Sequence, residues 1–142
     1  MKINTKHFGE IEVEDGQLID FEEGLPGFPD DRQFVLLENE DPFCWLQSCS
    51  DGDNAFILID AFSVIPDYSP QVDKEEFAPL GEYNADDFLI YNIVVLPEDV
   101  NEMTVNLIAP VVINSVTKKG RQVIAKNENY GVRHYMMKQR EA

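Results

Sequence analysis

The stretch Asn106-Leu107-Ile108-Ala109-Pro110-Val111-Val112-Ile113-Asn114 is the most informative part of this sequence for the fold. It is an apolar, β-forming segment between two amides, and it contains no ionisable side chain. Proline has no N–H to donate to a sheet, so Pro110 predicts an edge, a bulge or a break within the segment. The turn signal Lys118-Lys119-Gly120-Arg121 follows and predicts a hairpin. Nothing in the stretch does chemistry, which is typical of a rigid recognition element.

Short runs rich in β-branched and aromatic residues recur along the rest of the chain, with turn signals between them. The runs predict strands over residues 3–8, 10–13, 18–21, 34–37, 43–49, 55–60, 89–96, 103–109, 111–116 and 122–125. One short helix or helical turn is predicted over residues 74–80, and residues 130–140 are expected to form a strand followed by a frayed or helical tail, flexible from about residue 136. This regular spacing predicts one all-β domain over residues 1–142, a sandwich or a barrel with little helix.

The segment Gly24-Leu25-Pro26-Gly27-Phe28 is the main irregular feature. Pro26 and Gly27 suit the central positions of a type II turn, because proline fixes the first φ and glycine supplies the positive second φ. Such a turn presents Leu25 and Phe28 at its ends. Two interpretations remain open: Phe28 closes one end of the barrel, or the loop faces a partner.

The composition is that of an ordinary globular chain, with 142 residues of which 44% are hydrophobic. No apolar run approaches the roughly 20 residues that span a bilayer, and no signal-peptide pattern is present, so we expect a cytoplasmic protein without membrane contact. Cys44 and Cys49 are an odd number of residues apart, which places them on opposite faces of one strand and argues against a disulfide between them. Trp45, between them, is expected in the core.

The charge is strongly asymmetric along the chain, with a formal net charge of −16. Residues 1–102 carry 25 acidic and four basic side chains, whereas residues 103–142 carry two acidic and seven basic ones. The acidic surface serves either solubility or the steering of a basic partner. Direct binding of nucleic acid is disfavoured, because phosphate contacts need a basic surface.

No arrangement of residues in the sequence predicts catalysis, a cofactor or a metal. His7 and His134 lie near opposite ends of the chain and outside any metal-ligand spacing. Asp51-Gly52-Asp53-Asn54 begins like a calcium loop but is followed by phenylalanine where the loop needs glycine and glutamate, so a hairpin turn is the better interpretation. A small β-barrel ligand-binding protein or hydrolase of unknown substrate remains the alternative to a protein-binding role.

Several landmarks taken in order resemble the bacterial flagellar assembly factor FliW family. They are Gly24-Leu25-Pro26-Gly27-Phe28, Trp45-Leu46-Gln47-Ser48, Pro66-Asp67-Tyr68, the stretch from Asn106 to Asn114, Gly120-Arg121-Gln122-Val123 and Tyr130. The chain departs from the family at Ala61, where a proline often stands. The resemblance implies a small, mostly antiparallel β-barrel without enzymatic activity. It also implies two partners, flagellin and the RNA-binding translational regulator CsrA, whose repression of flagellin synthesis is lifted when free FliW binds it.

The contact residues are predicted from chemistry, because the resemblance assigns none. Aromatic side chains at turns make good binding anchors, and exposed carboxylates suit a basic partner. The predicted partner-binding residues are Phe28, Asp30, Asp31, Tyr68, Asp86, Asp87, Asn106 and Asn114.

Overall fold

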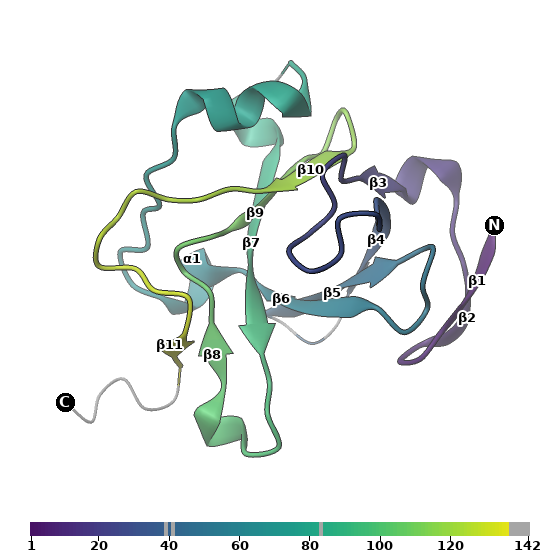
Figure 1. Ribbon diagram of the computed structural model, residues 1–142, viewed down its shortest axis with the longest axis horizontal. Coiled ribbons are helices and arrows are strands. Elements are labelled where there is room, and N and C mark those ends of the chain that lie inside the picture. Colours follow the sequence, from purple (N-terminus) through teal and green to yellow (C-terminus); the bar gives the residue numbers. More distant parts are fainter. Residues whose placement is uncertain (39, 41, 83, 137–142) are drawn as a thin grey trace.

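Seven strands close into a β-barrel in the computed structural model, which describes residues 1–38, 40, 42–82 and 84–136 (Figure 1). The strand order is β7-β6-β5-β4-β3-β10-β9, and β9 pairs again with β7. The strands are β3 (Ile19–Asp20), β4 (Gln33–Glu38), β5 (Phe43–Ser48), β6 (Ala55–Ile59), β7 (Phe88–Val95), β9 (Val111–Asn114) and β10 (Lys119–Gln122). Within the barrel, only the β3–β10 pair is parallel. The prediction of a mostly antiparallel β-barrel is confirmed.

The remaining elements surround this barrel. β1 (Lys2–Thr5) and β2 (Gly9–Glu12) form a separate hairpin, whereas β8 (Thr104–Val105) and β11 (His134–Tyr135) extend the sheet beyond β7. The helical elements are α1 (Ala61–Val64) and the 3-10 helices η1 (Asp15–Gln17), η2 (Lys74–Leu80), η3 (Ala85–Asp87) and η4 (Val100–Glu102). The helix expected over residues 74–80 is confirmed as η2. Residues 137–142 of the expected tail lie outside the described residues.

Pro110 separates two strands that lie along the same side of β7. β8 pairs with the second half of β7 and β9 with the first half, and residues 106–110 bend between them. The Asn106 carboxamide oxygen accepts a hydrogen bond from the Ala109 N–H (3.0 Å), and that of Asn114 accepts one from the Val116 N–H (2.9 Å). The two amides therefore close the turns at both ends of the segment. The bend shortens the strand expected over residues 103–109 to the two residues of β8.

The barrel wall is buried along the whole of β9, and parts of β7 are covered on the outside as well. Its interior holds Phe21, Phe34, Leu46, Leu58 and Ile113, all essentially inaccessible to solvent. Outside the barrel, η2 covers one part of these strands and the segment from α1 to Tyr68 covers another. Strands covered on both faces carry continuous apolar runs rather than an alternating pattern, which explains the sequence of β9.

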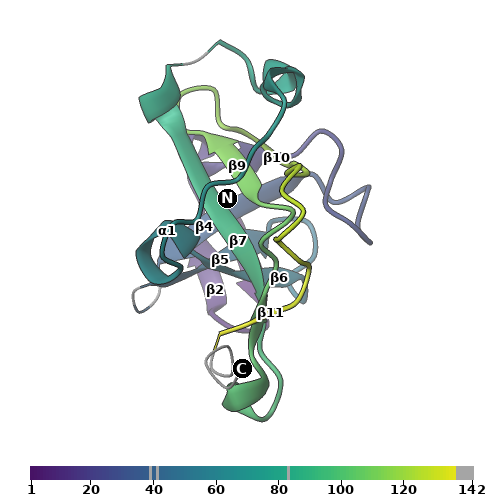
Figure 2. The ribbon, with the colours of Figure 1, turned by 90° about the vertical axis from the view of Figure 1, so that its left-hand side faces the viewer.

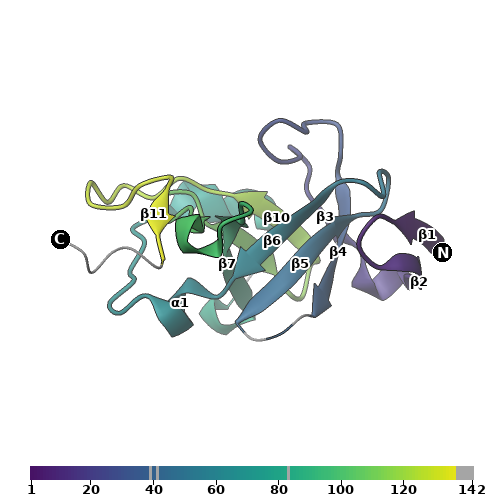
Figure 3. The same cartoon turned by 90° about the horizontal axis from the view of Figure 1, so that it is seen from below.

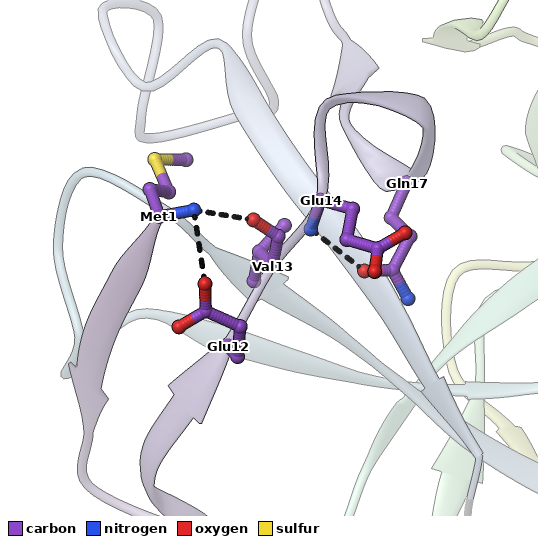
Figure 4. A network of polar contacts seen from close by, with 5 residues as sticks. All are labelled: Met1, Glu12, Val13, Glu14 and Gln17. Carbon is purple, nitrogen blue, oxygen red and sulfur yellow. Dashed lines mark hydrogen bonds and ion pairs between the residues drawn. The ribbon is translucent and has the colours of Figure 1, made fainter.

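The chain start is fastened to the strand that follows it. The Met1 amino group donates a hydrogen bond to the Val13 carbonyl (2.6 Å) and lies 3.6 Å from the Glu12 carboxylate (Figure 4). The Glu14 N–H donates to the Gln17 side-chain oxygen (2.8 Å) at the start of η1. These contacts fix the path of the chain from the β1–β2 hairpin into the barrel.

The β1–β2 hairpin covers one end of β5, and this position corrects the expectation for Trp45. Trp45 is half-buried rather than in the core. Its ring lies 4.7 Å from that of His7 and 5.5 Å from that of Phe8, measured between ring centroids. The hairpin therefore shields one side of the tryptophan and leaves the other side exposed.

Candidate protein-binding surfaces

The loop between β3 and β4 stands away from the barrel (Figure 3). The Phe28 N–H donates to the Leu25 carbonyl (2.8 Å) and Gly27 has a φ of 86°, so the predicted turn at Pro26-Gly27 is confirmed. Leu25 is 2% exposed and belongs to the barrel core, whereas Phe28 is 43% exposed. Leu25 thus fills the barrel end, and Phe28 is left on the surface beside Phe56.

The two carboxylates that follow Phe28 have different roles. Asp31 accepts hydrogen bonds from the Ser48 hydroxyl (2.8 Å) and from the Asn54 amide (2.7 Å), so it ties the loop to the β5–β6 hairpin. Asp30 is exposed. Asp30 therefore remains the carboxylate of this loop that is suited to a partner contact.

Tyr68 is buried, which corrects the prediction that it is a surface anchor. Its side chain is 5% exposed, and its hydroxyl donates to the Leu107 carbonyl (2.7 Å) and accepts from the Asn92 amide (2.9 Å). Burial raises the pKa of Tyr68 to about 12. The aromatic ring belongs to the layer that covers the outside of β7, so its role is structural.

Asn114 is also buried, and the prediction that it contacts a partner is corrected too. Its amide donates to the carbonyl groups of Leu80 (3.1 Å) and Glu82 (3.2 Å), which holds the end of η2 against β9. Asn106 is half-buried and closes the bend before Pro110. Both amides thus organise backbone rather than present a recognition surface.

The pair Asp86-Asp87 divides in the same way as Asp30-Asp31. Asp86 is exposed on η3. Asp87 is half-buried, and its carboxylate accepts a hydrogen bond from the Asn84 N–H (3.1 Å). In both acidic pairs, the first residue is free to meet solvent and the second fixes local structure.

An apolar hollow of about 300 Å³ lies at the projecting β7–β8 hairpin, and no residue of it was predicted as a contact. It is lined by Phe43, Trp45, Ile57, Val94, Leu96, Val100 and Met103. Leu96 is 50% exposed and Val100 is 56% exposed, and both line the same hollow, so they are not isolated surface residues. No signal in the sequence separates these residues from core residues, because their exposure depends on how the hairpin is folded.

A second, more polar hollow of about 900 Å³ opens at the barrel mouth. Its lining includes Glu38, Cys44, Asp60 and Tyr91. Burial, and then the charges of Asp60 and Glu38, raise the pKa of the Cys44 thiol to about 11, so the group is a neutral thiol near pH 7. A thiol in this state is a poor nucleophile, and neither histidine lines the hollow. The arrangement does not resemble the machinery of a hydrolase.

In the described part of the chain, no group of three or more histidine, cysteine or acidic side chains is placed to hold a metal ion. In the same residues, no helix has the length and apolar character to cross a membrane. Cys44 and Cys49 are both free thiols.

Three of the basic residues after residue 102 form ion pairs with acids of the first part of the chain. The pairs are Lys119 with Glu22, Arg121 with Glu23 and Glu76, and Lys126 with Asp73. Arg121 also donates to the Glu76 carbonyl (2.9 Å). These cations are occupied within the protein, which weakens the case for a nucleic-acid-binding tail.

Comparison with known proteins places the whole barrel in one family. The family described as "FliW protein" matches residues 2–136. The flagellar assembly factor FliW of Alkaliphilus metalliredigens is 42% identical over 142 residues, which cover 98% of this chain and 88% of the relative. The FliW of Geobacillus kaustophilus is 38% identical and the alignment covers 100% and 99% of the two chains. These relatives are named as assembly factors, not as enzymes.

The fold agrees with this match. A crystal structure of the flagellar assembly factor FliW superposes with a TM-score of 0.91 at 37% sequence identity, covering 99% of both chains. Sequence and structure agree along essentially the full length, and this chain belongs to the FliW family of flagellar assembly factors.

Proposed function

We propose that this chain binds flagellin in the cytoplasm, and that it also binds and antagonises the translational regulator CsrA, which relieves repression of flagellin mRNA translation. The apolar hollow at the β7–β8 hairpin is the observation that supports flagellin binding. A protein that accompanies a filament subunit before assembly has to cover apolar surface that is later buried. An exposed apolar hollow on a highly charged chain is suited to that task.

Three features support the hollow as the flagellin site. It is lined by apolar side chains alone. Trp45 contributes an aromatic side chain of the type that most often dominates binding energy. Glu98 and Asp99 are exposed on the same hairpin, so charged residues border the apolar centre, as in many protein interfaces.

The experiment is flagellin capture by purified variants. Leu96→Asp places a carboxylate in the hollow, whereas Val116→Asp makes the same change at a site that is 67% exposed outside the hollow. We expect Leu96→Asp to weaken capture at least about tenfold, because a buried interfacial charge without a partner costs several kcal/mol. Val116→Asp should bind like the parent. Equal binding by both variants would place the flagellin site elsewhere.

Phe28→Ala tests the second apolar candidate in the same assay. The side chain is exposed, so truncation should leave the fold intact. Loss of capture by Phe28→Ala alone would assign flagellin to the β3–β4 loop. Loss by both variants would indicate an interface that extends over both surfaces.

The negative net charge of the chain is the observation that supports CsrA binding. An RNA-binding protein presents a basic surface, and the net charge of −16 attracts such a surface. Association rates measured over a salt series should fall as salt rises, since screening acts over about 8 Å at physiological ionic strength. Asp30→Asn combined with Asp86→Asn should lower the rate at low salt while Asp31 and Asp87 keep their structural bonds. A rate insensitive to salt would exclude steering by any acidic cluster.

A further inference from the structure

We propose that the first half of β7 is a docking edge for an extended peptide segment that carries a lysine or arginine. The segment adds as a strand beside Ile90 and places its basic side chain between Glu38 and Asp60. This surface is distinct from the apolar hollow and from the β3–β4 loop. The proposal does not depend on which partner supplies the segment.

The hydrogen-bonding direction of β7 shows which backbone groups face away from β9. The Asp87 carbonyl accepts from the Ser115 N–H (2.9 Å), and the Ile93 carbonyl accepts from the Asn106 N–H (2.9 Å). Backbone groups of successive strand residues point to opposite edges. The odd-numbered residues of β7 therefore face β8 and β9. The N–H and C=O of Ile90 face the opposite edge.

The strand on that opposite edge ends before it reaches Ile90. β6 pairs with β7 up to Ile59, which lies opposite Asn92. If β6 continued in this register, Ala61 would be the next residue to face β7, and it would lie opposite Ile90. Ala61 instead begins α1, and its carbonyl accepts from the Ile65 N–H (2.8 Å). Figure 2 shows β9 along one side of the first half of β7, and α1 on the opposite side, level with the middle of β7.

The cause of this early end is a helix cap. The Asp60 carboxylate accepts hydrogen bonds from the Phe62 N–H (3.1 Å) and the Ser63 hydroxyl (3.0 Å). An aspartate that caps a helix turns the chain out of the sheet at that residue. The sequence thus ends β6 at Ile59, two residues before the position that would pair with Ile90. Open strand edges of this kind accept added strands in peptide recognition.

Two hollows border the edge and share Asp60 and Tyr91. The smaller, of about 260 Å³, is lined by Phe62 and Ile90 among others. The larger is the polar hollow at the barrel mouth, which adds Glu38. The backbone edge is therefore accompanied by room for side chains on an added strand.

Charge identifies the occupant. Within the described residues, neither Glu38 nor Asp60 forms an ion pair with a basic side chain. Two carboxylates beside a half-buried tyrosine attract a cation and repel an acidic peptide. Because strand side chains alternate, the neighbour of the basic residue would lie toward the smaller hollow beside Phe62, which is 50% exposed. An alternating basic and apolar sequence fits both hollows.

The test is a titration of the ¹⁵N-labelled full chain with a synthetic peptide, followed by the amide signal of Ile90. The probe is acetyl-Val-Lys-Val-Lys-Val-Lys-amide. The first control peptide has glutamate in place of lysine, and the second has the probe sequence with every backbone nitrogen methylated. We expect a saturable shift of Ile90 with the probe, at a dissociation constant of about 1 mM for so short an edge. Neither control peptide should produce it.

The protein variant is Glu38→Gln, matched by Glu10→Gln on the exposed surface of β2. Glu38→Gln should weaken binding about threefold, the effect of one partly exposed ion pair, and Glu10→Gln should leave it unchanged. Equal binding of the methylated peptide, no shift of Ile90 into the millimolar range, or equal effects of the two variants would overturn the proposal. A shift of the Ile90 signal that appears without peptide, as the protein concentration is raised, would also overturn the proposal. It would indicate that a second copy of the protein pairs with this edge.

Discussion

The Tyr68 hydroxyl donates a 2.7 Å hydrogen bond to the Leu107 carbonyl across a buried contact. The same oxygen accepts from the Asn92 amide of β7, whose second donor bond reaches the Asn106 carbonyl (2.8 Å). One phenol therefore joins the segment after α1, the middle of β7 and the bend before Pro110. The bend that the sequence placed at Pro110 is thus held from outside the segment itself.

Tyr68→Phe should lower the free energy of unfolding by about 1–3 kcal/mol, because the Leu107 carbonyl and the Asn92 amide lose a buried partner. Tyr91→Phe removes the same atom where the described residues offer the hydroxyl no hydrogen bond, and it should cost much less. Urea denaturation of the two variants measures the difference. Equal stability losses in the two variants would show that the hydrogen bonds of the Tyr68 hydroxyl do not stabilise the fold.

The free energy of unfolding should also depend on pH through ionisation of the Tyr68 hydroxyl. Burial raises the pKa of Tyr68 from its ordinary value of 10.0 to about 12 in the folded protein. The folded state therefore holds this proton more tightly than the unfolded state. The stability that the protonated Tyr68 hydroxyl contributes is fully present below about pH 10 and is lost as the pH rises toward 12. The stability gap between the parent and Tyr68→Phe should narrow over that window, and a constant gap would contradict the shift.

Local chemistry allowed some features of this molecule to be predicted, and long-range contacts hid the others. The turn at Pro26-Gly27 and the break at Pro110 follow from the backbone limits of proline and glycine, which act within a few residues. The exposure of Tyr68 depends on contacts with Leu107, 39 positions away. The residues next to Tyr68 therefore carry no information about its burial.

The apolar hollow was not predictable for a related reason. Its lining comes from three separate parts of the chain, represented by Trp45, Ile57 and Leu96. Each of these residues resembles an ordinary core residue in the strand that the sequence predicts around it. Only the pairing of β5, β6 and β7, together with the projection of the β7–β8 hairpin, leaves them around a shared open space. Burial within a strand can be inferred from alternation, but the absence of a covering layer cannot.

Val112→Asp should destabilise the protein by several kcal/mol. Val112 is 1% exposed and lies against Leu80 and Val123 outside the barrel. A carboxylate there either loses its hydration without a partner or stays protonated, and both cost a large part of a typical domain stability of about 5–15 kcal/mol. Val116→Asp, at a position that is 67% exposed, is the matched control and should melt like the parent. Equal melting temperatures would contradict the burial of Val112.

Gly52→Ala should detach the β1–β2 hairpin from the barrel. A Cβ at this position would overlap the backbone oxygen of Asn4, and no side-chain rotation relieves that clash. The Lys6 N–H donates to the Gly52 carbonyl (3.0 Å), so the clash falls on the contact that holds the hairpin. Trp45 would lose its neighbours there, and its fluorescence maximum should move to longer wavelength. Gly16→Ala, where an added Cβ meets nothing within 4 Å, should leave the spectrum unchanged.

Cys44 should react slowly with iodoacetamide, and its rate should continue to rise at pH values where ordinary thiols have levelled off. Only the thiolate reacts, and the pKa of Cys44 is raised to about 11 by burial and by the charges of Asp60 and Glu38. At pH 8 an unperturbed thiol with a pKa of about 8.5 is about a quarter ionised, so Cys44 should react about two orders of magnitude more slowly than a free cysteine.

Peptide mapping by mass spectrometry gives this rate separately from that of Cys49. Glu38→Gln removes one of the charges that oppose ionisation and should speed the reaction, whereas Glu10→Gln should not change it. A rate for Cys44 that levels off near pH 9 would show that the thiolate is not suppressed. The hollow at the barrel mouth would then lack the negative potential that its carboxylates are expected to produce, and it would no longer favour a basic side chain.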